Sequence, residues 1–223
     1  MVANPSARSP YPTDVTTQST EHWNRVYQTK QPTEVSWYRE HLDTSLALIR
    51  AAGGKAILDV GGGESTLVDD LVADGGFDVT VLDIAATALE VTQRRLGEAA
   101  ARVRWIVGDV TTADLPPAYY DVWHDRAVFH FLTGEAERAR YVAQVARSVR
   151  PGGHVIVGTF GPDGPLQCSG LDVVRYDAEH LHGAFGARFE LVDHREEIHH
   201  TPAGREQQFV WCFCRVERPS PGE

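Results

Sequence analysis

The chain has 223 residues and a formal net charge of −10, and its 42% hydrophobic and 23% charged residues are typical of a globular protein, not of a disordered, fibrous or coiled-coil one. The acidic balance, with Lys30 and Lys55 as the two lysines, disfavours nucleic acid as a partner, because proteins that grip phosphate backbones present a basic surface. No apolar run approaches the roughly 20 residues of a membrane-spanning helix, no secretory signal opens the sequence, and three cysteines favour free thiols, so we expect one cytoplasmic domain without a membrane partner.

The N-terminal part divides into a polar tail and an aromatic segment. Residues 1–20 are rich in Ser, Thr and Pro, which predicts a disordered tail ahead of a single domain over residues 21–223. Apolar residues at helical spacing predict a helix over residues 41–52. We interpret residues 21–52 as a lid over a ligand site, with ordinary core packing of an N-terminal helix as the alternative. The aromatic side chains that suggest a lid are Trp23, Tyr27, Trp37 and Tyr38.

Short β-branched runs then alternate with helical patterns, which is typical of βαβ units around a mainly parallel sheet. The predicted strands are 56–60, 79–83, 103–107, 121–124 and 154–160. The predicted helices between them are 65–73, 85–96 and 135–149. Two further extended runs, 188–193 and 207–216, predict a terminal antiparallel hairpin whose turn contains Pro202 and Gly204.

A glycine-rich turn connects the first of these strands to a helix. Gly61, Gly62 and Gly63 follow the strand end Asp59-Val60, so a ligand can lie against bare backbone beside the unpaired N–H groups of a helix start. Two more acids, Asp83 and Asp109, end or follow the next two strands, where open α/β sheets place their ligands. A phosphate-binding G-x-G-x-x-G or P-loop pattern is absent. The pattern therefore favours an adenosine carrying a cationic amino-acid tail.

Together these segments resemble the ordered motifs of the class I S-adenosylmethionine-dependent methyltransferases. The resemblance covers about half the chain, and its five segments are 59–63, 81–84, 108–110, 120–123 and the turn 149–154. It implies an α/β, Rossmann-like three-layer sandwich with a seven-stranded, mainly parallel sheet in the order 3-2-1-4-5-7-6 and strand 7 antiparallel. It also implies S-adenosyl-L-methionine as co-substrate. Ser65 stands where the family often has a third glycine.

The resemblance assigns the donor site residue by residue. It implies that Asp59 and the glycine turn hold the methionine part, Asp83 the ribose, and Asp109 with Val110 the adenine. We add Ile84, which follows Asp83, and Trp37 of the predicted lid to this donor site.

The acceptor side is predicted around the end of the fourth strand and the loops after the fifth. His124, Asp125 and His130 are candidates for a general base, although a hydrogen-bonding structural role is the alternative for each. The candidates for contact with the acceptor are Arg126, which suits a carboxylate on donor or acceptor, together with Tyr27, Cys168, His199 and His200. Cys168 with the histidine pair would suit a thiolate or a soft metal or metalloid, but no close Cys/His ligand spacing supports a metal, and we predict none.

Three functions follow from these motifs. We expect transfer of a methyl group to a nucleophilic N, O or S atom of a small molecule. A protein lysine methyltransferase is an alternative, because the segment 35–38 faintly resembles lysine-modifying relatives. A non-catalytic adenosylmethionine-binding protein is another, since a fold does not determine a reaction.

Overall fold

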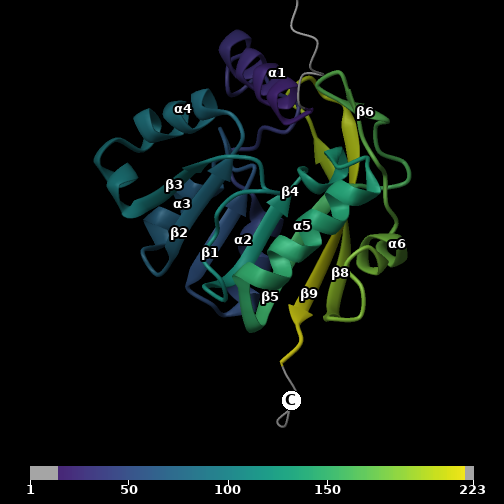
Figure 1. The fold of residues 1–223 in the computed structure, drawn as a ribbon. Coiled ribbons are helices and arrows are strands. Elements are labelled where there is room, and N and C mark those ends of the chain that lie inside the picture. Colours follow the sequence, from purple (N-terminus) through teal and green to yellow (C-terminus); the bar gives the residue numbers. More distant parts are fainter. Residues whose placement is uncertain (1–14, 219–223) are drawn as a thin grey trace, which may run out of the picture.

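A computed structural model of the chain describes residues 15–218, which form a seven-stranded sheet with helices on both faces (Figure 1). The strand order is β3-β2-β1-β4-β5-β9-β8. Strands β1 to β5 pair in parallel, and β9 runs antiparallel to both β5 and β8. Since β8 and β9 are the sixth and seventh strands of this sheet, the predicted order and the antiparallel seventh strand are confirmed.

The sheet strands are β1 (Ala56–Val60), β2 (Asp78–Asp83), β3 (Val103–Val107), β4 (Tyr120–Arg126), β5 (Val149–Phe160), β8 (Phe189–His200) and β9 (Glu206–Val216). The helices are α1 (Val15–Thr29), α2 (Asp43–Ala52), α3 (Leu67–Asp74), α4 (Ala86–Leu96), α5 (Glu135–Ser148) and α6 (Ala178–Gly183), with 3₁₀ turns η1 (Gly97–Arg102) and η2 (Phe129–Phe131). A separate small hairpin consists of β6 (Gln167–Cys168) and β7 (Leu171–Asp172).

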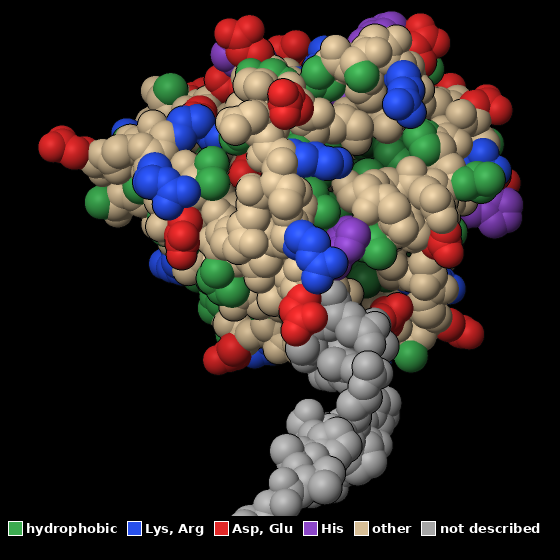
Figure 2. All heavy atoms as spheres, turned by 90° about the horizontal axis from the view of Figure 1, so that it is seen from above, with side chains coloured by type: hydrophobic (Ala, Val, Ile, Leu, Met, Phe, Trp, Pro, Cys, Tyr) green, Lys and Arg blue, Asp and Glu red, His purple; other side chains and the backbone are tan. Residues whose placement is uncertain are grey.

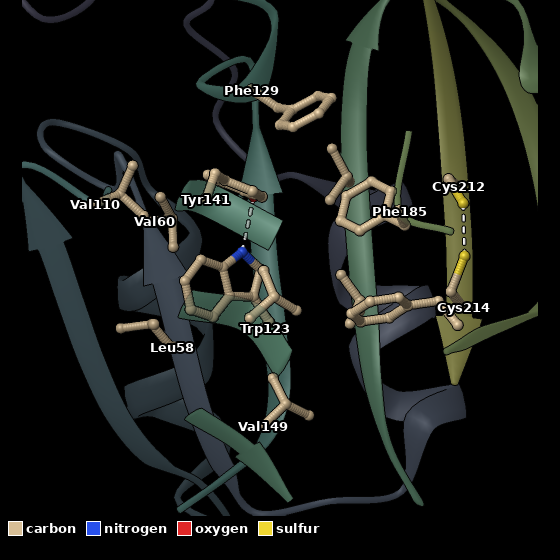
Figure 3. Close-up of a cluster of buried hydrophobic side chains, with 14 of the residues drawn as sticks. Leu58, Val60, Val110, Trp123, Phe129, Tyr141, Val149, Phe185, Cys212 and Cys214 are labelled. Carbon is tan, nitrogen blue, oxygen red and sulfur yellow. Dashed lines mark hydrogen bonds between the residues drawn. The ribbon is translucent and has the colours of Figure 1, made fainter. Parts of the chain in front are cut away.

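Strand alternation divides the core into two clusters, one on each face of the sheet. Successive residues of a strand point to opposite faces. Trp123 therefore packs with α5 and α6 in one cluster, whereas Val122 packs with α2 and α3 in the other. In the first cluster the indole of Trp123 donates a hydrogen bond of 2.8 Å to the hydroxyl of Tyr141 on α5, and Phe185 lies in the same cluster (Figure 3). Both faces are covered, which gives the predicted three layers.

The two ends of the chain depart from the sequence prediction. Residues 1–14 of the predicted tail lie outside the described residues, but helix α1 already begins at Val15, so residues 15–20 are helical. Strand β8 extends to His200, seven residues beyond the predicted end at residue 193. The sequence did not predict this length because β8 is the edge of the sheet and most of its side chains are exposed, leaving no apolar alternation. Among residues 15–218, no helix has the length and apolar character needed to cross a bilayer.

Candidate active site

A cavity of about 240 Å³ opens at the carboxyl ends of β1, β2 and β4, with side chains of α1 on its opposite wall. Figure 2 views the molecule from the side on which α1 lies, and shows acidic and basic side chains interspersed there instead of gathered into one basic patch. Of the predicted site residues, those that line this cavity are Tyr27, Trp37, Gly61, Asp83, Ile84, Asp109, Val110, Arg126 and Cys168. Most of the predicted donor site thus lies around one space.

The glycine turn after β1 brings bare backbone to this cavity. Gly61 adopts a φ of 66°, and a Cβ there would lie 2.1 Å from a methyl group of Val128, so only glycine fits. A Cβ at Gly62 would lie 2.5 Å from Oδ2 of Asp59. That Oδ2 atom is buried and has no hydrogen-bond partner within the described chain. Gly62 and Asp59 do not line the larger cavity but border a smaller pocket behind it, together with Gly61 and Glu64.

Asp83 and Asp109 stand at the ends of β2 and β3, as predicted. Oδ1 of Asp83 accepts a hydrogen bond of 2.8 Å from the backbone N–H of Ala85, while the same carboxylate lines the cavity. Burial raises the pKa of Asp83 to about 7. Asp109 accepts hydrogen bonds from the backbone N–H and the hydroxyl of Thr111, both at 2.8 Å, which fix its carboxylate at the cavity edge.

Glu64 is a site residue that the sequence interpretation missed. Its side chain is buried, neither carboxylate oxygen has a partner within the described chain, and burial raises its pKa to about 7. With Oδ2 of Asp59 it places unpaired carboxylate oxygens beside the glycine turn. Buried carboxylates without partners are costly unless a proton or a cation joins them. The signal was available in the sequence as an acid inside a glycine turn that otherwise carries small residues.

His124 lies behind the glycine turn, away from the larger cavity. Its Nδ1 is 2.8 Å from Oδ1 of Asp59, and its Nε2 is 2.9 Å from the hydroxyl of Ser45 on α2. Because a carboxylate only accepts, Nδ1 carries the proton of the first contact. Both ring nitrogens are therefore engaged, which favours positioning of Asp59 as the role of His124, and its role as a base facing the acceptor stays a prediction.

Asp125 and His130 also lie outside the larger cavity. Asp125 is fully buried and accepts hydrogen bonds from the backbone N–H groups of Val128 and Phe129 and from the hydroxyl of Tyr141, so it holds the turn that follows β4. His130 is buried between Phe131 and Phe160, and burial lowers its pKa to about 3. Neither side chain lines the larger cavity, so direct proton transfer by Asp125 or His130 stays a prediction, and their contacts favour the structural alternative.

Arg126 and Cys168 do line the larger cavity. Nη1 of Arg126 donates a hydrogen bond of 3.0 Å to the backbone carbonyl of Trp37, and its guanidinium lies 4.8 Å from the ring centroid of Phe209. The chain turns sharply after Arg126, since Ala127 has a φ of 72°. Burial raises the pKa of Cys168 to about 11, so its side chain is a thiol at neutral pH and not the thiolate that the sequence allowed.

The histidine pair divides between two environments, because His199 and His200 point to opposite faces of β8 instead of lying in a loop. Nε2 of His199 is 2.7 Å from the backbone carbonyl of Ser36, which links β8 to the segment after α1. His200 is exposed and faces Glu206 at 3.8 Å. Neither lines the cavity with Cys168, and no group of three or more metal-ligating side chains occurs within residues 15–218.

The predicted lid residues lie on α1 and the segment after it. Trp23 packs edge-on against Trp37 and Phe131, with ring centroids 6.0 Å and 5.2 Å away, and all three line the cavity. The side-chain oxygen of Asn24 accepts a hydrogen bond of 2.8 Å from the hydroxyl of Thr87, which ties α1 to α4. The sequence analysis missed Phe131, Phe160, Gln207 and Phe209 as cavity residues, because they come from three separate places in the chain.

Comparisons with known proteins agree with this arrangement. A family model described as a methyltransferase domain matches residues 57–153. An uncharacterized methyltransferase of Mycobacterium tuberculosis is 32% identical over 120 residues, which are 54% of this chain and 58% of that protein. The eEF1A lysine and N-terminal methyltransferase of Mus musculus is 26% identical over 145 residues, 62% of this chain and 21% of that protein. The chain thus spans less than two thirds of these relatives' lengths.

A solved structure shares the fold over almost the whole chain. It is the 1,6-didemethyltoxoflavin-N1-methyltransferase of Burkholderia thailandensis, solved with 1,6-didemethyltoxoflavin and S-adenosylhomocysteine bound. The TM-score is 0.66 at 19% identity, and the match covers 95% of each chain.

Proposed function

We propose that the chain is a class I S-adenosylmethionine-dependent methyltransferase, which transfers the methyl group of S-adenosyl-L-methionine to a nucleophilic N, O or S atom of a small-molecule acceptor. The observation that carries this proposal is the carboxylate of Asp83 at the end of β2, which lines a cavity flanked by the glycine turn. A cytoplasmic location is part of the proposal, and it is supported by three free cysteines.

The residues around the cavity fit the donor. Asp83 is placed to accept from the ribose hydroxyls, and Asp109 with Val110 borders the space for the adenine. Oδ2 of Asp59 and the carboxylate of Glu64 supply unpaired negative charge for the ammonium of the methionine part. When bound, S-adenosylmethionine supplies an electrophilic methyl group. The chain itself then has to hold the acceptor in line with that methyl group and exclude water from the cavity. The side chains of Trp23, Trp37 and Phe131, which line the cavity, are placed to exclude water.

Two observations bear on the acceptor. The cavity is covered by aromatic side chains of α1 and the segment after it, which favours a small molecule. The mouse relative is named as an eEF1A lysine and N-terminal methyltransferase, and this similarity supports a protein lysine as the second candidate for the acceptor.

The test is transfer of a radiolabelled methyl group by the full chain into a cell lysate that is then separated into protein and small-molecule fractions. We expect label in the small-molecule fraction. Label confined to protein would favour the lysine alternative. Binding of S-adenosylhomocysteine without transfer to any fraction would leave a non-catalytic binding protein, and absence of binding would refute the proposed family function.

The pH dependence of donor binding follows from Asp83 and Glu64. Because burial raises both pKa values to about 7, the folded protein without donor binds more protons than the unfolded chain between about pH 4 and 7, and these groups make it less stable as the pH rises through that window. The donor needs the ionised carboxylates. We therefore expect the stabilisation by saturating S-adenosylhomocysteine, measured by thermal unfolding, to grow from pH 6 to pH 8. Glu64→Gln should flatten this increase, and an equal shift at all pH values would contradict the assignment.

His124 should affect donor affinity through Asp59. His124→Leu leaves Oδ1 of Asp59 buried without its partner, which costs about 1 to 3 kcal/mol, so we expect the affinity for S-adenosylhomocysteine to fall about tenfold in calorimetry. Ser45→Ala removes only the contact to Nε2 and is the milder control. If His124→Leu instead lowered the turnover rate at saturating donor while leaving donor affinity unchanged, the positioning role would be wrong.

A further inference from the structure

Arg126 is an unusual residue for the wall of this cavity. Within residues 15–218 it is the only Lys or Arg that lines the space. Nη1 donates to the carbonyl of Trp37, but Nη2 is buried and has no hydrogen-bond partner in the described chain. Burial lowers the pKa of Arg126 to about 10, so the guanidinium is still charged at neutral pH.

Within the described residues 15–218, no carboxylate forms an ion pair or hydrogen bond with this guanidinium. The nearby acid Glu197 is occupied, since Oε1 pairs with Arg39 at 2.8 Å and Oε2 accepts from the indole of Trp211 at 2.9 Å. The guanidinium rests instead on the face of Phe209, 4.8 Å from its centroid, which is a weaker contact than an ion pair. A partly buried cation with a free donor is stabilised strongly by an anion that enters the cavity.

The direction of the side chain places Arg126 on the acceptor side. The sheet order is β1-β4-β5-β9, so Arg126 at the end of β4 reaches across β5 to Phe209 on β9. Arg126 also borders the smaller pocket with Asp59 and Glu64, where the donor's ammonium is expected, but its guanidinium lies over the ring of Phe209 on the opposite side of β4 from β1. The neighbouring lining residues Phe131, Phe160 and Phe209 are aromatic.

We propose that the acceptor is a small organic carboxylate with a flat, apolar body, whose carboxylate pairs with Nη2 of Arg126 while the aromatic rings of Phe131, Phe160 and Phe209 contact the body. This inference rests on the proposed methyltransferase function and names the acceptor class of the same cavity. A charge-assisted hydrogen bond in a sheltered site is worth roughly a 10- to 100-fold change in affinity.

The test compares carboxylates with their amides. The probes are 3-hydroxybenzoate, 3-aminobenzoate and 3-mercaptobenzoate, each beside the corresponding benzamide, titrated by calorimetry into the full chain saturated with S-adenosylhomocysteine. We expect the acids to bind about 10- to 100-fold more tightly than the amides. Arg126→Met should abolish this preference, and Arg126→Lys should keep part of it. Arg94→Met, which removes an exposed arginine outside the cavity, should leave the preference intact.

Two outcomes would overturn the inference. One is equal binding of acids and amides, or no binding of any acid, by wild-type protein that binds S-adenosylhomocysteine normally. The other is loss of S-adenosylhomocysteine affinity in Arg126→Met without loss of affinity for 5′-methylthioadenosine, which lacks the carboxylate, because Arg126 would then belong to the donor. Failure to bind S-adenosylhomocysteine at all would count against the proposed function itself. Thermal unfolding of each variant shows whether it is folded.

Discussion

Replacing Asp83 with alanine is expected to lower the affinity for S-adenosylhomocysteine about a hundredfold. The carboxylate lines the cavity and is the acceptor placed for the ribose, and hydrogen bonds to a charged group contribute about 1.5 to 3 kcal/mol each. Losing one strong or two weaker hydrogen bonds to the ribose therefore removes about 3 kcal/mol of binding free energy. This corresponds to roughly two orders of magnitude in the dissociation constant. Isothermal calorimetry with S-adenosylhomocysteine measures the effect directly.

Asp83→Asn separates binding from folding. Burial holds the pKa of Asp83 at about 7, which means that the fold tolerates the neutral side chain, and asparagine resembles the protonated acid in shape. We expect this variant to keep the thermal stability of the donor-free protein and the acceptor for the N–H of Ala85, but to bind the donor more weakly than wild type. Wild-type affinity in Asp83→Ala would remove the basis for the donor site described here.

The positions of the candidate donor residues were predictable from the sequence because they depend on order along the chain. Parallel strands end at one edge of the sheet, so acids at the ends of successive strands meet there wherever the sheet forms. Asp83 and Asp109 needed no knowledge of side-chain packing to be placed. Glu64 was missed because its importance comes from burial, which spacing does not reveal.

The acceptor side was less predictable because it depends on which face a side chain occupies. The predicted fourth strand ended at His124, whereas β4 continues to Arg126. With that extension, the period of two puts His124 and Arg126 on one face and Asp125 on the other. Asp125 then turns toward Tyr141 on α5, and His124 toward Ser45 on α2. The predicted strand end was two residues short, and this difference alone changes which of these side chains are expected to face the cavity.

Prediction of the strands from the sequence was also less accurate at the edge of the sheet than at its centre. The central strands are buried on both faces, and their apolar runs identify them, as with β1, all of whose residues are buried. The end of β8 between Asp193 and His200 is mostly exposed and charged, so its extended conformation is set by pairing with β9 and not by its own sequence.

Removal of residues 1–38 is expected to reduce methyl transfer at least about a hundredfold while the sheet remains folded. The segment supplies Trp23, Tyr27 and Trp37 to the cavity wall, and misplacement of reacting groups by about 1 Å already costs about 10²-fold. The fully buried members of both core clusters all lie between residues 42 and 216, so the deletion leaves them in place. Labelled-methyl transfer into the small-molecule fraction reports the loss, and cooperative thermal unfolding with a retained circular dichroism spectrum reports the fold.

Single substitutions test the lid separately, in case the deletion of residues 1–38 unfolds the protein. Trp23→Ala and Trp37→Ala each remove one wall of the cavity, and the two rings touch, so their effects on transfer should not add independently. Trp105→Ala is the matched control, because this partly buried tryptophan on β3 bonds to the carbonyl of Ala100 and lies outside the cavity. It should lower stability without a comparable loss of transfer. If the truncated chain transferred methyl groups within a few-fold of the full chain, residues 15–38 would be packing for the domain and not its lid.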